Sequence, residues 1–145
     1  MAEKTKGLIS IDAPADAVMG VIADFEAYPA WVAAAKSVEV TAVGTSGRAD
    51  RVRFVLDAGM VKDTYELQYN WGPDGMSVSW ELLSGEIQKS QSGSYTLHSE
   101  PDGTTSVTYE LTVDLTIPMI GLFKRKAEKI ITDTALKELK KRVEG

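Results

Sequence analysis

The sequence contains one histidine, His98, and no cysteine. A Ser–His–Asp triad or a histidine metal cluster around His98 would need partner residues that this sequence does not supply. The absence of cysteine excludes disulfides, thiolate catalysis and cysteine-ligated metals. His98 also falls on the polar parity of its predicted strand, beside a turn, which is typical of a solvated surface residue. The sequence therefore predicts no catalytic residue of these types, no bound metal and no cofactor.

Two pairs of carboxylates could in principle serve as acid and base, namely Asp24 with Glu26 and Glu66 with Glu81. Asp24 lies at the end of a predicted helix, where it can simply shape the turn. Glu66 and Glu81 fall on the water-facing parity of their strands. The glycines lie at predicted turns, and no G-x-x-x-x-G-K-[ST] phosphate loop occurs. These residues indicate surface and turn chemistry rather than catalysis.

Large aromatic residues form the most informative cluster, because they recur on the predicted inward parity of successive strands. A buried tyrosine hydroxyl needs a hydrogen-bond partner, so several inward tyrosines indicate either an internal polar network or a site for an amphipathic ligand. Gln91 shares the inward parity and can join them. The sequence predicts a ligand-binding set made of Trp31, Phe54, Tyr69, Trp80, Gln91, Tyr95, Tyr109 and Phe123.

The elements that would position this cluster begin with a strand around residues 8–11. Pro14 then favours the first turn of a short helix, capped by Asp12 or Ala13 and ending near Asp24. Tyr28-Pro29 interrupts that helix, because proline disfavours helical geometry in the residue before it. We expect a second short helical turn to begin at Trp31.

From Lys36 onward the apolar period changes to two, and about six strands follow one another. The predicted strands span residues 38–43, 52–56, 64–71, 76–82, 91–97 and 107–115. Glycine-rich turns such as Gly72–Gly75 separate them, so we expect an antiparallel meander with one buried face and one solvated face. A strongly twisted sheet of this size curls, and one helix cannot fill its concave side, so an apolar cavity should remain.

A long helix from about Pro118 to Val143 is expected to cover that concave side with Ile120, Phe123, Ala127 and Ile131. The segment from Lys124 to Gly145 holds eight Lys or Arg against four Asp or Glu, whereas the whole chain carries a net charge of −5. The basic residues either complement the C-terminal helix dipole or form a docking face for an acidic partner.

This order of elements resembles the START-like (helix-grip) superfamily, and within it the polyketide cyclase/dehydrase and lipid-transport group. The resemblance rests on residues 11–14 (IDAP), 24–31 (DFEAYPAW) and 107–111 (VTYEL), and the run 117–122 (IPMIGL) resembles small actinobacterial members. It implies a single α+β domain over residues 1–145, with a curved antiparallel sheet around a long C-terminal helix and two short helices after the first strand. Its motifs are structural rather than catalytic.

The leading functional hypothesis is non-catalytic binding of a hydrophobic or amphipathic small molecule, such as a lipid, quinone or polyketide, in the cavity. One alternative is a cyclase/dehydrase-type enzyme in which Tyr69, Tyr95 or Tyr109 polarises a carbonyl or moves a proton. Another is an interaction module that docks weakly through its basic C-terminal helix. The acidic balance argues against nucleic-acid binding, and the polar N-terminus, without a signal peptide or membrane span, favours a cytoplasmic location.

Overall fold

The computed structural model describes residues 4–45, 47–57, 62–115 and 121–145, with the side chains of residues 115 and 121–127 outside the description. Its elements follow the order β1 (Thr5–Ile11), α1 (Ala15–Ala23), the 3₁₀ helix η1 (Phe25–Ala30), β2 (Ala35–Val43), β3 (Ala49–Asp57), β4 (Lys62–Trp71), β5 (Ser77–Gly85), β6 (Gln88–Ser99), β7 (Thr105–Leu115) and α2 (Gly121–Glu144).

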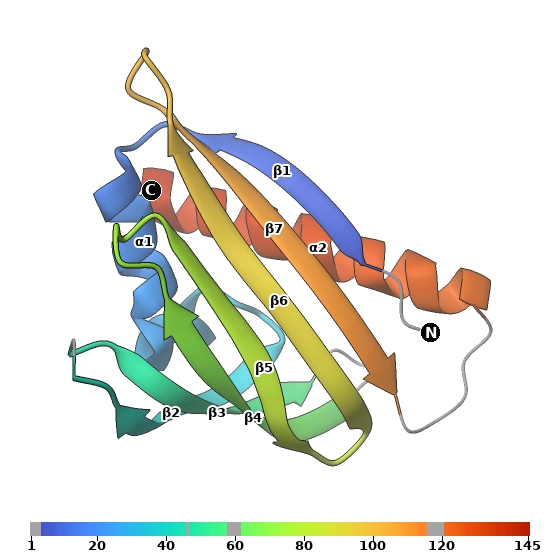
Figure 1. Cartoon of the computed structure of the whole chain (residues 1–145). Helices are drawn as coiled ribbons and strands as arrows, with labels where there is room; N and C mark the ends of the chain where they lie inside the picture. Colours follow the sequence, from blue (N-terminus) through green and yellow to red (C-terminus); the bar gives the residue numbers. More distant parts are fainter. Residues whose placement is uncertain (1–3, 46, 58–61, 116–120) are drawn as a thin grey trace.

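In this part of the chain, seven strands form one sheet in the order β1-β7-β6-β5-β4-β3-β2. Every neighbouring pair is antiparallel. Strands β2 to β7 form a meander, and β1 adds to the edge at β7, so α1 and η1 connect one edge of the sheet to the other. Figure 1 shows α2 running across the sheet behind β1 and β7, whereas β2 to β4 curve away from it. The predicted α+β fold, with a curved antiparallel sheet and a long C-terminal helix, is confirmed.

The face that α2 turns toward the sheet differs from the predicted one. Its buried side chains are Glu128, Thr132, Leu136 and Leu139, and they recur with helical spacing. Ile131 is instead 43% exposed, so its predicted packing on the sheet is wrong; Ile120 and the side chains of Phe123 and Ala127 lie outside the described residues. Because α2 packs on β1 and β7 rather than across the middle of the sheet, the buried face is rotated by one residue, or about 100°.

Hydrogen bonds from α2 tie its C-terminal half to both connections of the fold. Lys140 Nζ donates to the carbonyl oxygen of Ser10 at 2.7 Å, and Glu144 Oε2 accepts from the backbone N–H of Asp12 at 2.8 Å. The Asp12 N–H and then Lys140 hold the pKa of Glu144 below its ordinary value. Glu138 Oε2 accepts from the backbone N–H of Ala33 at 3.0 Å, just before β2. These contacts fix α2 relative to the β1–α1 junction and the η1–β2 segment.

Two local predictions near the short helices were wrong. The N-cap of α1 is Pro14 itself, in an extended conformation and without a side-chain cap, so neither Asp12 nor Ala13 caps the helix. Tyr28-Pro29 lies inside η1, which ends at Ala30 instead of beginning at Trp31. Asp24 leaves the α-helical region, with φ −87° and ψ 71°, and the chain continues in the tighter 3₁₀ form.

Gly7 in β1 allows α2 to approach the sheet closely. A Cβ atom at this position would lie 2.7 Å from Thr132 Cγ2 and 2.8 Å from Leu136 Cδ1, which is inside van der Waals contact. The absence of a side chain at Gly7 therefore sets the distance between β1 and α2.

Replacing Gly7 with Ala should lower the free energy of unfolding by about 1–3 kcal/mol, because the added methyl group overpacks the β1–α2 contact. The matched control is Gly20→Ala in α1, where an added Cβ meets nothing within 4 Å. That control should gain up to about 1 kcal/mol from helix propensity. Denaturant unfolding measures both, and an equal gain in the two variants would contradict the close approach.

Candidate functional site

A cavity of about 280 Å³ lies between the concave face of the sheet and α2. Its walls combine the inward side chains of β3 to β7 with residues of α1, η1, the start of β2 and α2. The lining residues are Ile22, Tyr28, Trp31, Val32, Ala34, Ala35, Phe54, Leu56, Tyr65, Leu67, Tyr69, Trp80, Gln91, Tyr95, Tyr109, Ile130, Ile131, Thr134, Ala135 and Glu138. Most are apolar or aromatic, as is usual for small-molecule pockets.

The cavity opens beside α2. Its exposed lining residues are Ile130, Ile131 and Thr134, all on that helix, and the other lining residues are buried or half-buried. Ile130 is 55% exposed, so two isoleucines border both the cavity and solvent. This arrangement gives a ligand an apolar entrance along the helix.

The structure places most of the predicted ligand-binding set around this one cavity. Trp31, Phe54, Tyr69, Trp80, Gln91, Tyr95 and Tyr109 all border it. The side chain of Phe123 lies outside the described residues. That these residues contact a ligand stays a prediction, but their assembly around one space follows from the strand parity.

The cavity lining includes residues that were absent from the predicted set, among them Tyr28, Tyr65 and Glu138. Tyr28 sits in η1, where no strand parity pointed to it, and Tyr65 had the inward parity but was left out of the set. Glu138 reaches the cavity from α2, although the inward positions of the strands had offered no carboxylate. The four-residue spacing from Thr134 to Glu138 places both on one helix face and could have indicated this.

The aromatic rings of the cavity wall contact one another in a continuous set. Tyr95 and Tyr109 face each other across β6 and β7, with ring centroids 4.9 Å apart and ring planes inclined at 63°. The indole of Trp80 lies 5.6 Å from the ring of Tyr95 and 5.8 Å from that of Tyr109. Phe54 stacks on Tyr65 at 5.3 Å. Such offset and edge contacts fix the rings and give the cavity rigid walls.

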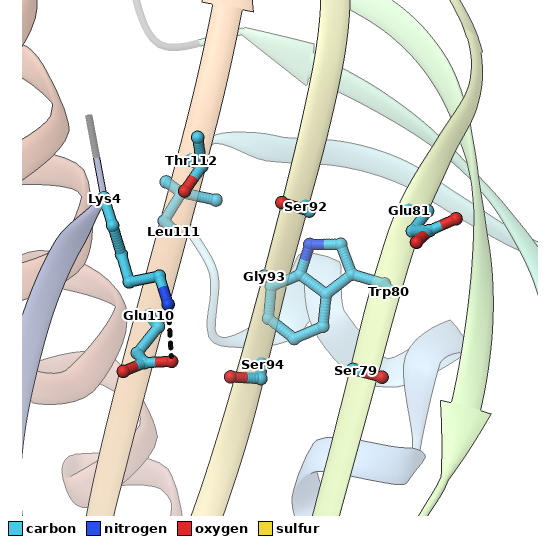
Figure 2. Close-up of a pocket in the computed structure, with 10 residues that line it drawn as sticks. All are labelled: Lys4, Ser79, Trp80, Glu81, Ser92, Gly93, Ser94, Glu110, Leu111 and Thr112. Carbon is cyan, nitrogen blue, oxygen red and sulfur yellow. Dashed lines mark ion pairs between the residues drawn. The ribbon is translucent and has the colours of Figure 1, made fainter. Parts of the chain in front are cut away.

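Gly93 of β6 makes room for the Trp80 indole. A Cβ atom at Gly93 would lie 2.3 Å from Trp80 Cζ2 and 2.9 Å from the backbone oxygen of Glu110. Figure 2 shows the indole reaching from β5 toward Gly93, with the Lys4–Glu110 ion pair beyond it. This glycine therefore allows the Trp80 side chain to lie across the neighbouring strand.

The hollow in Figure 2 is a second candidate site, of about 230 Å³, and it lies on the water-facing side of β5 to β7. Its rim is formed by short polar and charged side chains, including Ser79, Ser92, Ser94 and Thr112. Two of its three charged residues, Lys4 and Glu110, already pair at 3.6 Å. The concave cavity combines apolar walls with converging polar groups, so it is the stronger candidate.

Five tyrosines border the cavity and differ in their hydrogen bonds. The hydroxyl of Tyr28 donates to the carbonyl oxygen of Ile22. The hydroxyls of Tyr65, Tyr69, Tyr95 and Tyr109 make no hydrogen bond to any residue that the structure describes. Because unpaired phenols are costly away from water, these four hydroxyls are available to a polar group inside the cavity.

The phenols of the cavity stay neutral well into the alkaline range. Burial is the main cause that raises the pKa of each of the five tyrosines. The charge of an ionised Tyr109 would raise the pKa of the other four further, which shows that their hydroxyls converge on one region. Neutral phenols donate and accept hydrogen bonds, but they supply no phenolate base at neutral pH.

A chain of polar side chains leads away from the cavity wall into the sheet. Trp80 Nε1 donates to Gln91 Oε1 at 2.9 Å, Gln91 Nε2 donates to Gln88 Oε1, and Gln88 Nε2 donates to Asp63 Oδ2 at 2.8 Å. Asp63 shares the parity of Tyr65, so its burial could have been predicted. Gln88 is buried because an irregularity between Gln88 and Ser90 shifts the register of β6.

The residues that the sequence analysis judged not to be catalytic lie away from the cavity. The His98 side chain is exposed, with Nε2 4.0 Å from Glu100. Glu66 accepts from Thr41 Oγ1 at 2.6 Å, and Glu81 is exposed at the convex hollow. Among the described residues, no three His, Cys, Asp or Glu side chains gather in a way that could hold a metal ion.

In the described ranges, no helix combines the length and the apolar character needed to cross a membrane.

Conformational stability should fall as pH rises above about 10, the ordinary pKa of tyrosine. The folded pKa values are raised by burial, so the unfolded chain releases phenol protons first and unfolding becomes more favourable with increasing pH. Urea unfolding between pH 8 and 11 measures this. Lysines titrate in the same range, so Tyr109→Phe is the control and should show a shallower decline. Identical declines, with all phenols ionising normally in the folded protein, would contradict the burial.

The comparison with known proteins agrees with this geometry. The family model described as polyketide cyclase/dehydrase and lipid transport matches residues 3–144. A START superfamily protein from Mycobacterium smegmatis has 20% identity and a TM-score of 0.90, with 97% of each chain covered. An aromatase/cyclase, Zhui, from a Streptomyces species has 16% identity and a TM-score of 0.83, covering 99% of this chain and 94% of its own. No curated protein matches the sequence. The chain belongs to the polyketide cyclase/dehydrase and lipid-transport family.

Proposed function

We propose that the protein binds a neutral, amphipathic small molecule in the concave cavity. The observation that carries this proposal is the combination of apolar walls with four tyrosine hydroxyls that have no partner among the described residues. A hydrocarbon ligand would leave those phenols unsatisfied, whereas oxygen atoms on a ligand would pair with them. The apolar body of the same ligand would gain about 25 cal/mol per Å² of surface buried.

The walls favour a flat ligand with ring systems. Phe54, Tyr65, Tyr69, Trp80 and Tyr109 present rigid ring faces and edges to the cavity. Rings bind aromatic ligands through offset stacking and edge contacts, beyond the burial of apolar area. An aromatic or quinone-like molecule with oxygen substituents therefore suits this cavity better than a single flexible chain.

The charges around the cavity favour a neutral ligand. Among the described lining residues, the one ionisable carboxylate is Glu138, and there is no Lys, Arg or His. A buried ligand carboxylate would meet no described cation there, and an unpaired buried charge is expensive. Glu138 is itself engaged by the backbone N–H of Ala33. A fatty acid is thus a poorer fit than an uncharged ketone, quinone or phenol.

A cyclase or dehydrase reaction is the second candidate, because converging neutral phenols can stabilise charge on a carbonyl oxygen. The Zhui aromatase/cyclase has a similar fold, and its sequence is 16% identical to this chain. This similarity in fold supports the alternative. Tyr109 is close enough to the other four phenols that its ionisation would raise the pKa of each. Turnover of a poly-β-ketone by the wild type that is lost in Tyr109→Phe, with binding retained, would favour this alternative.

Docking through a basic C-terminal helix is the weaker alternative. Lys140 already bonds to Ser10 and Glu144, and Lys129 pairs with Asp133 at 3.3 Å. These cations serve the helix and its attachment to the fold, so their number alone does not indicate a partner.

Tyr109→Phe should raise the Kd for a neutral aromatic ketone or naphthoquinone by about 2–10-fold, because one hydrogen bond to the ligand is lost. The folded protein should remain stable. Trp71→Phe is the control. It removes the hydrogen bond from Trp71 Nε1 to Ala49 outside the cavity, at 2.8 Å, so it should lower stability and leave Kd unchanged.

A thermal-shift titration with these probes and with a long-chain fatty acid reports both effects. At a ligand concentration one hundred times Kd, binding should add about 2.7 kcal/mol to the stability. The absence of a shift with every neutral probe, or a shift with the fatty acid alone, would contradict the proposed function.

A further inference from the structure

Asp63, at the start of β4, is a buried carboxylate that lies behind the cavity wall. It is 4% exposed. Its Oδ1 accepts from the backbone N–H groups of Glu86 at 2.8 Å and Ile87 at 3.2 Å, and its Oδ2 accepts from Gln88 Nε2. These donors close the turn between β5 and β6 around the carboxylate. A buried charge with this many donors is a fixed part of the structure.

The hydrogen bonds continue from Asp63 through Gln88 and Gln91 to Trp80. Gln91 and Trp80 border the cavity, whereas Asp63 and Gln88 do not. This relay, consisting of Asp63, Gln88, Gln91 and Trp80, therefore connects a buried negative charge to two residues that face the ligand space.

The two ends of the relay determine the orientation of both amides. The Trp80 indole N–H can only donate, and an ionised carboxylate can only accept. Gln91 must therefore turn Oε1 toward Trp80 and Nε2 toward Gln88, and Gln88 must turn Nε2 toward Asp63. Flipping either amide would place two donors or two acceptors against each other.

The carbonyl oxygen of Gln91 consequently lies next to the Trp80 indole, and its amide nitrogen lies next to Gln88. This oxygen has a second lone pair beyond the one used by the indole. Hydrogen bonds in a chain polarise one another, so the charge of Asp63 makes this oxygen a stronger acceptor.

We propose that Asp63 is a positioning residue that presents the Gln91 carbonyl oxygen to the cavity, so that the site selects a neutral ligand bearing a hydroxyl group. This inference rests on the proposed function and narrows its ligand class from oxygen-bearing molecules to hydroxylated ones. The cavity phenols then form hydrogen bonds with the other oxygen atoms of the ligand.

The first test exchanges the two ends of the relay. Asp63→Asn places an amide N–H against Gln88 Nε2, and Gln91→Glu places an extra acceptor in the chain, so each variant contains one mismatch. In the double variant, the introduced asparagine donates to Gln88, Gln88 donates to the introduced glutamate, and that glutamate still accepts from Trp80. Each single change should lower Tm by roughly 3–10 °C, and the double variant should recover most of that loss.

The control for removing a carboxylate from β4 is Glu66→Gln, on the opposite face of the same strand, which should leave Tm nearly unchanged. The indole N–H resonance of Trp80, assigned with Trp80→Phe, should shift in both single variants and return in the double one. The positioning role would be overturned if the Tm losses of the two single variants added up in the double variant. It would also be overturned if the Trp80 indole resonance did not shift in Asp63→Asn.

The second test compares 2-naphthol with 2-methoxynaphthalene, which have the same rings but differ in the hydrogen-bond donor. The wild type and Glu66→Gln should bind the naphthol about 3–10-fold more tightly. The ratio of the two Kd values should fall toward one in Asp63→Asn. It should return in the double variant, where the introduced glutamate is the acceptor.

Equal binding of both probes by the wild type, or a preference unchanged in Asp63→Asn, would overturn this inference and leave the proposed function standing. Binding of neither probe would contradict the proposed function itself, and the inferred ligand class would fall with it.

Discussion

The constraint on which the structure depends is the mismatch between a wide curved sheet and a single narrow helix. Alternate side chains of β3 to β7 must face the concave side, and the described part of α2 packs mainly along β1 and β7. Gly7 lets the helix settle closely against β1, so the remaining concave surface stays uncovered farther along the sheet. The cavity, its entrance beside Ile130 and Ile131, and the aromatic character of its walls all follow from this geometry.

Polar groups then decide what the cavity is suited to hold. Burial keeps the tyrosines neutral, which removes strong bases but leaves several hydrogen-bonding hydroxyls. The buried charge of Asp63 is separated from the cavity by two amides and an indole. The site is therefore apolar in its surface and polar at a few fixed points, a combination that recognises a neutral ligand by the placement of its oxygen atoms.

Much of this could be predicted from the sequence because strand parity is a strong signal. Phe54, Tyr69, Trp80, Tyr95 and Tyr109 share that parity, and all of them border the cavity. The buried face of α2 was harder to predict. Ile131 and Thr132 are neighbours in the sequence, and only the packing of α2 on β1 determines which of them is buried. Tyr28 lies in a 3₁₀ helix without a repeating pattern. The burial of Gln88 depends on an irregularity in β6 that alternation does not reveal.

On this view, a ligand occupies the concave cavity rather than the convex hollow of Figure 2. Intermolecular nuclear Overhauser effects between isotope-labelled protein and 2-naphthol test it most directly, since they report which side chains touch the bound rings. We expect contacts to Phe54, Tyr109 and Ile131. Contacts to Ser92 and Thr112 on the convex face, with none to the cavity, would contradict it.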